Sequence, residues 1–94
     1  MEATEFKESA QFIARRNVSA RVVRVMASFD PNSGNLSVIY CTKGEPTDDD
    51  VEDCELTCAE LIAEFPQIRT AETKCVSSEQ CAQSDEEAVV FSKS

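Results

Sequence analysis

The chain is built around residues 47–66, which read TDDDVEDCELTCAELIAEFP. Thr47 is a suitable N-cap, and Asp50 stands three residues later, which is a variant of the capping box. Three consecutive aspartates then occupy the first turn, where the helix dipole favours negative charge. Pro66 ends the pattern, because a helix usually ends before the residue that precedes a proline. This stretch therefore predicts the main helix of the protein.

The predicted helix is amphipathic at about 100° per residue. The stripe expected to be buried consists of Val51, Cys54, Cys58, Leu61, Ile62 and Phe65. The opposite side is acidic and carries Asp49, Glu52, Asp53, Glu60 and Glu64. Leu56 lies among these acids. An apolar side chain surrounded by one sign of charge suggests a docking surface, although a single exposed leucine also occurs without any function.

Shorter patterns predict the remaining elements. They are a helix at 4–17, strands at 18–30 and 35–43 joined as a hairpin by Pro31-Asn32-Ser33-Gly34, a weaker strand at 67–76, a polar loop at 77–87 and a short strand at 88–91. In the first helix Phe6, Ala10 and Ile13 share one face. In the first strand Val23, Val25, Ala27 and Phe29 alternate onto one face, which we expect to point inward.

This order predicts an α+β fold for a single domain spanning residues 1–94. Its elements follow the order αββαββ, and we expect a four-stranded antiparallel sheet with both helices on one face. Residues 9–15 are similar to residues 58–64, which fits either a tandem αββ duplication or chance. The other sheet face would expose Val22 and Met26, so we expect a homodimer that covers this apolar patch.

The charge is unevenly distributed along the 94 residues, whose net charge is −9. Residues 1–43 hold four acids and six bases, a net of +2, whereas residues 44–94 hold fourteen acids and three bases, a net of −11. The acidic half argues against direct nucleic-acid binding, because phosphates require Lys and Arg. It favours either solubility alone or contact with a basic partner. With no apolar run long enough for a membrane and no basic, apolar leader, we expect a cytoplasmic protein.

Catalytic chemistry has few candidates in this sequence. It contains no histidine, which excludes Ser-His-Asp and Cys-His catalysis. Its five cysteines are Cys41, Cys54, Cys58, Cys75 and Cys81. Because the count is odd and the expected compartment is reducing, we expect all five to be reduced. Their spacing is unlike that of structural zinc sites, so we expect no cofactor, no metal and no enzymatic activity, with Cys75 as the least improbable nucleophile.

These features favour a small non-enzymatic binding protein that caps a basic surface of a macromolecular partner. Its binding residues would be Asp49, Glu52, Asp53, Leu56 and Glu60, and the partner would be a nuclease toxin or a nucleic-acid-binding protein. In size and charge the chain is similar to small acidic inhibitors, such as bacteriocin immunity proteins and DNA-mimic proteins. No motif carries this resemblance, so it implies no residue roles.

Two other classes of function remain open at this point. One is a small-ligand-binding or dimeric α+β module whose site on the open sheet face involves Val22, Met26 and Tyr40. The other is a thiol or metal protein that uses the cysteines.

Overall fold

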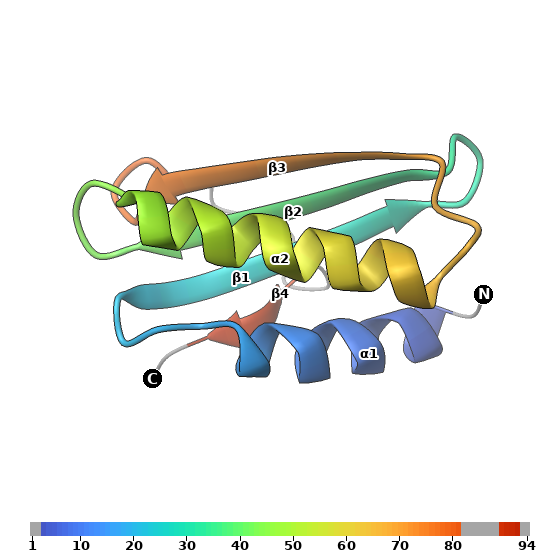
Figure 1. Ribbon diagram of the computed structural model, residues 1–94, viewed down its shortest axis with the longest axis horizontal. Helices are drawn as coiled ribbons and strands as arrows, with labels where there is room; N and C mark the ends of the chain where they lie inside the picture. The colour runs from blue at the N-terminus through green and yellow to red at the C-terminus, as the bar shows by residue number, and fades with distance from the viewer. Residues whose placement is uncertain (1–2, 82–88, 93–94) are drawn as a thin grey trace.

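The protein folds into two helices packed on one face of a four-stranded sheet, as the computed structural model shows for residues 3–81 and 89–92 (Figure 1). The elements are α1 (Ala3–Arg16), β1 (Val22–Asp30), β2 (Asn35–Thr42), α2 (Asp48–Glu64), β3 (Thr70–Ser77) and β4 (Val89–Ser92). The α+β class, the αββαββ order and the two layers are therefore confirmed. Most of the loop expected at 77–87, and the first residue of the strand expected at 88–91, lie outside the described residues.

The sheet has the strand order β3-β2-β1-β4 and is mixed. β1 is antiparallel to both β2 and β4, but β2 and β3 are parallel, so the expectation of an entirely antiparallel sheet is wrong for that pair. The physical reason is that α2 is the connection between these two strands. A helix returns the chain to the end of the sheet where β2 began, and the next strand then runs in the direction of β2. Since β3 and β4 lie at opposite edges, the second half does not repeat the hairpin of the first.

The hydrophobic core lies between the helices and the sheet. Its largest fully buried apolar side chains come from α1, β1, β2 and α2, and they include Ile13, Val25, Leu36, Val38, Tyr40 and Leu61. Burial of each aliphatic side chain of this kind contributes roughly 1.5–3 kcal/mol. Phe6 links α1 to α2, because its ring centroid lies 5.8 Å from that of Phe65 at the end of α2.

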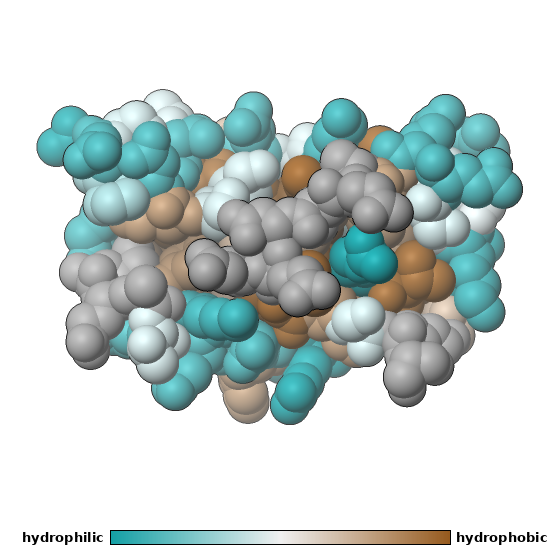
Figure 2. All heavy atoms as spheres, turned by 180° about the vertical axis from the view of Figure 1, so that it is seen from behind, coloured by the Kyte–Doolittle hydropathy of each residue, from teal (hydrophilic) through white to brown (hydrophobic). Residues whose placement is uncertain are grey.

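A bulge in β1 changes which side chains point inward. The register with β2 shifts between Val22 and Arg24, so Val22 joins Val25 and Ala27 in the core, whereas Val23 does not. Met26 lies outside the core cluster but is only 3% exposed. The face opposite the helices shows hydrophilic side chains along both long rims and apolar ones between them (Figure 2). Val22 and Met26 are themselves buried, so they do not form the exposed patch from which a homodimer was expected.

One disulfide joins Cys41 in β2 to Cys81, with 5.9 Å between the two Cα atoms. The expectation that all five cysteines are reduced is wrong for this pair. The two cysteines are 40 residues apart in sequence, and a backbone hydrogen bond brings their segments together. In this bond the Ser78 amide donates to the Thr42 carbonyl oxygen at 2.7 Å. That bond holds the chain leaving β3 against the end of β2, beside Cys41. Cys54, Cys58 and Cys75 are free thiols.

Candidate functional site

The start of α2 is held rigidly by the predicted capping box. The Asp50 amide donates to Thr47 Oγ1 at 3.2 Å, and the Thr47 amide donates to Asp50 Oδ2 at 2.9 Å. The Arg21 Nε donates to the same carboxylate at 3.1 Å, and its guanidinium also binds the carbonyl oxygens of Lys43 and Glu45. Burial alone would raise the pKa of Asp50, but these bonds from Thr47 and Arg21 outweigh it and hold the pKa below its usual value. The orientation of α2 on the sheet is thereby fixed at its first turn.

The outer face of α2 is acidic, as predicted. Asp49 and Glu52 are exposed, and Leu56, about one turn beyond Glu52 along the helix, is 49% exposed. Asp53 is half-buried, and its pKa is raised by partial burial and then by the nearby charges of Asp50 and Asp49. Carboxylates so close together repel one another, and a positive charge from outside would relieve this repulsion. We call Asp49, Glu52, Asp53 and Leu56 the acidic face.

Glu60 differs from the other predicted binding residues because it packs against α1. Its carboxylate forms an ion pair with Arg16 and accepts a hydrogen bond from Asn17 Nδ2 at 2.7 Å. Asn17 also donates to Thr57 Oγ1 at 3.3 Å. The structure therefore brings Asp49, Glu52, Asp53 and Leu56 together on one open surface, whereas the Glu60 charge is already paired within the chain.

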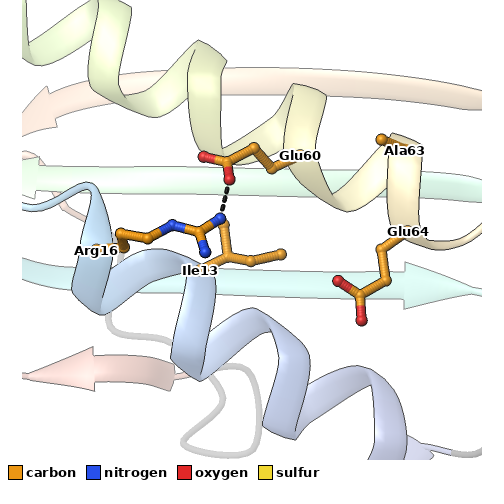
Figure 3. A pocket seen from close by; sticks show the side chains of 5 residues that line it. All are labelled: Ile13, Arg16, Glu60, Ala63 and Glu64. Carbon is orange, nitrogen blue, oxygen red and sulfur yellow. Dashed lines mark hydrogen bonds and ion pairs between the residues drawn. The ribbon is translucent and has the colours of Figure 1, made fainter.

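A shallow pocket of about 340 Å³ lies between the two helices beside this pair (Figure 3). It is lined by Ile13 and Arg16 of α1 and by Glu60, Ala63 and Glu64 of α2. Glu64 points toward α1, where its carboxylate accepts a hydrogen bond from Ser9 at 3.0 Å. The Arg16–Glu60 ion pair and the Ser9–Glu64 hydrogen bond thus already join the two helices at this pocket, so its carboxylates serve mainly to hold the helices together.

Phe12 is an exposed aromatic residue that the sequence-based list of binding residues lacks. It is 65% exposed, and the Arg16 guanidinium carbon lies 5.2 Å from the centroid of its ring. The available signal was its position beside the Phe6–Ala10–Ile13 face rather than on it. An exposed aromatic ring in a cation–π contact with an arginine is a typical component of a protein interface.

The buried stripe of α2 is rotated relative to the prediction. Cys54, Cys58, Leu61 and Phe65 are buried as expected, but Val51 and Ile62 are 39% and 42% exposed. Asp50 and Thr57 are buried in their place. The reason is polar: the Tyr40 hydroxyl reaches the core and needs a hydrogen-bond partner, which is Thr57 Oγ1 at 2.5 Å. This bond and the Arg21–Asp50 pair turn α2 so that Val51 and Ile62 lie at its side.

The sheet-face and thiol alternatives receive no support from the described residues. Val22 and Tyr40 belong to the core and Met26 is buried, so the three do not line an open site. Burial raises the pKa of Cys54 to about 12, and it also raises the pKa values of Cys58 and Cys75. A reactive thiol requires the opposite shift. Among the residues that the structure describes, no three metal-binding side chains cluster together.

Comparison with known protein families identifies the family of this chain. The family model for the MafI2 immunity protein matches residues 15–94, which include the end of α1 and all of β1, β2, α2, β3 and β4. This chain belongs to the MafI2 immunity protein family. MafI2 immunity proteins are non-enzymatic and inhibit a cognate MafB toxin, which agrees with the predicted inhibitor class. No curated protein matches the chain. Within the described ranges, neither α1 nor α2 is long and apolar enough to cross a membrane.

Proposed function

We propose that this MafI2 immunity protein inhibits its toxin by covering a basic surface of that toxin with the acidic face of α2. The observation that carries this proposal is the arrangement of Asp49, Glu52 and Asp53 around the exposed Leu56. No base occurs between Lys43 and Arg69, so nothing positive interrupts this surface along the helix. The capping box and Arg21 hold α2 in place before binding, which reduces the entropy lost on association.

The charges act mainly on the encounter with the toxin. A surface of one sign attracts an oppositely charged partner over roughly the Debye length, which is about 8 Å at physiological ionic strength. Such steering raises the association rate more than it changes the dissociation rate. Partial burial raises the pKa of Asp53 most, and the charges of Asp50 and Asp49 raise it further, so a basic partner would relieve the second of these two effects.

Leu56 is the proposed apolar anchor at the centre of the interface. Interfaces concentrate their binding energy in a few well-packed residues, which a polar rim surrounds. Phe12 is a candidate to extend the contact with the toxin onto α1, since its ring is exposed and the Arg16 guanidinium lies over it. The acids would form the rim, and Leu56 would enter a recess on the toxin.

The toxin that fits this surface best is a nuclease or another nucleic-acid-binding protein. Surfaces that bind nucleic acid are rich in Lys and Arg, because they neutralise phosphates. An acidic face that occupies such a surface excludes the substrate sterically, and the immunity protein itself needs no contact with nucleic acid. We propose that this inhibition takes place in the cytoplasm, where the nucleic acids of the cell are located.

Competition for the toxin tests the proposal. The cognate MafB toxin would be purified as a catalytically inactive variant, and its binding to labelled RNA and DNA would be measured with increasing immunity protein. We expect the immunity protein to displace the nucleic acid, and the Leu56→Ala variant to require more protein for the same displacement. A toxin that binds nucleic acid and immunity protein at the same time would contradict the proposed occlusion.

A further inference from the structure

The outer edge of β3 is open for pairing. β3 has eight residues and pairs with β2 on one side, and in the described part of the chain no strand pairs with its other side. Residues 70–74 are all exposed, the register is regular, and the strand contains no proline. Long, regular edges are normally blocked by a bulge, a proline, a covering element or charged side chains, and of these β3 has only the charges of Glu72 and Lys74. The other edge strand, β4, has only four residues and a register shift beside it.

An exposed apolar strip lies on the side of α2 that faces this edge. Val51 and Ile62 are separated from Glu60 by roughly 160–180° around the helix, and Glu60 marks the side that faces α1. The neighbouring stripe of α2 contacts β3, because Cys54 Sγ lies 3.7 Å from the Lys74 carbonyl oxygen. Val51 and Ile62 are thus large, exposed apolar residues of α2 that belong neither to the core, nor to the contact with α1, nor to the acidic face.

We propose that the β3 edge pairs with the β3 edge of a second copy of this chain. The two strands would run antiparallel around a two-fold axis at Thr73, and the two sheets would become one. Residues that oppose each other in an antiparallel pair point to the same face of the sheet. A two-fold axis perpendicular to the sheet must therefore lie between the two strands at a position where one residue opposes its own copy. An axis at Thr73 aligns residues 70–76 of both copies and places Glu72 opposite Lys74 of the second copy, twice.

Charge selects this register over its neighbours. An axis at Glu72 would oppose Glu72 to itself, and an axis at Lys74 would oppose Lys74 to itself, and directly opposed like charges destabilise a sheet. Within the described residues neither side chain forms an ion pair, although Glu72 accepts a 3.4 Å hydrogen bond from the neutral Asn35 amide. Glu72 and Lys74 alternate with the β3 residues that pair with the core residues Leu36, Val38 and Tyr40, so both charges lie on the sheet face opposite the helices. The edge is therefore complementary to itself.

The same axis brings the apolar strips together. α2 runs antiparallel to β3 (Figure 1), and the Cys54–Lys74 contact fixes their relative height. With rises of about 1.5 Å per helix residue and about 3.3 Å per strand residue, Thr73 is level with roughly residue 56 of α2. Val51 and Ile62 then lie at similar distances on either side of the axis, roughly 8–9 Å away. Val51 of one copy would therefore face Ile62 of the other.

A second copy accounts for both the charge pattern of the β3 edge and the apolar strip of Val51 and Ile62. An unrelated partner strand would have to match these two features by coincidence. Isologous contacts of this kind use the same patch on both subunits. The net charge of −9 per chain opposes association, but ionic strength near 0.15 M screens charges that lie more than about 8 Å apart. The acidic face points away from the axis, so both copies could bind toxin.

Sedimentation equilibrium on the full chain at physiological salt tests the proposal. We expect a monomer–dimer equilibrium that Glu72→Lys or Lys74→Glu weakens by about tenfold, since each change converts two attractive cross-strand pairs into repulsive ones. The double variant with both changes restores the opposite-charge pairs and should recover the affinity of the parent. Ile62→Ser should weaken the dimer, whereas Leu56→Ser, an equally exposed position on the acidic face, should not.

Three results would overturn the proposal. The first is a protein that stays monomeric up to millimolar concentration. The second is a dimer that the single charge reversals leave unchanged, or that the double variant fails to restore. The third is a dimer that Leu56→Ser dissociates and Ile62→Ser does not, which would place the contact on the acidic face. Circular dichroism of each variant shows that a loss of dimer is not a loss of fold.

Discussion

Asp50 is the residue on which the position of α2 depends most. It is 1% exposed, and its carboxylate accepts hydrogen bonds from Thr47 and Arg21. We expect Asp50→Ala to lower the free energy of unfolding by about 2–3 kcal/mol, because it leaves the Thr47 amide and the Arg21 guanidinium without their acceptor. Asp49→Ala, at the exposed neighbouring position, should change it by less than about 0.5 kcal/mol. Urea denaturation of both variants measures this difference, and equal midpoints would contradict it.

Asp50 and Asp53 respond to pH in opposite ways. Because the pKa of Asp50 is lowered in the folded protein, its stabilising effect is present above the unfolded pKa of about 3.9 and is lost as pH falls through the folded value. The pKa of Asp53 is raised, so its charge destabilises the fold at neutral pH, and this cost disappears as Asp53 becomes protonated.

We therefore expect Asp53→Asn to stabilise the protein at neutral pH by up to about 0.5 kcal/mol, the magnitude of a like-charge pair on a helix. The advantage over the parent should vanish as pH approaches about 4. Thermal melts across this range measure it. A variant that is less stable than the parent at pH 7 would show that Asp53 makes a favourable contact instead.

Leu56 separates binding from folding. Its side chain is half exposed, so Leu56→Ala should leave the melting temperature nearly unchanged. If it anchors the toxin, the variant should dissociate faster, by a factor that corresponds to about 1–2 kcal/mol. Surface-based binding kinetics with the toxin measure the rate, and Ile62→Ala provides a control at similar exposure outside the acidic face. Equal dissociation rates for the parent and the Leu56→Ala variant would show that Leu56 does not anchor the toxin.

At the scale of the element, the charge of α2 should control how fast the toxin is captured. The helix carries eight acids and no base: Asp48, Asp49, Asp50, Glu52, Asp53, Glu55, Glu60 and Glu64. Reversing Asp49 and Glu52 to Lys should slow association more than it accelerates dissociation, and the parent should lose affinity as salt increases. Reversing Glu5 and Glu8 on α1 changes the net charge equally at exposed positions elsewhere. If both pairs of reversals slow association equally, the toxin responds to net charge and not to this face.

At the scale of the whole molecule, the Cys41–Cys81 disulfide closes a loop over a sequence separation of 40. Loop-closure entropy for this length corresponds to a stabilisation of about 4 kcal/mol, from which any native-state strain is subtracted. We expect strong reductant, or Cys41→Ser, to lower the melting temperature, whereas Cys58→Ser in the core serves as a control that removes a free thiol. Melts with chelator alone test for metal separately. A melting temperature that is insensitive to reductant would show that the fold does not depend on this bond.

The amino-acid sequence by itself determined the elements that short-range chemistry specifies. The capping box of Thr47 and Asp50, the apolar face of Phe6, Ala10 and Ile13, and the turn that closes the β1–β2 hairpin each depend on residues within a few positions. The same local reasoning placed the acids and Leu56 on the outside of α2. The class of a small acidic inhibitor also follows from composition and charge.

Only the tertiary structure decided the features that depend on contacts between distant residues. The parallel β2–β3 pair follows from the path of α2 across the sheet, and Val22 is buried because a bulge shifts β1 by one residue. Thr57 replaces Ile62 in the core because the Tyr40 hydroxyl, 17 residues away in sequence, requires a partner. Cys41 meets Cys81 because the Ser78–Thr42 hydrogen bond joins two strand ends. Helical periodicity predicts a buried stripe only to within one or two positions, and buried polar groups in other elements then choose among them.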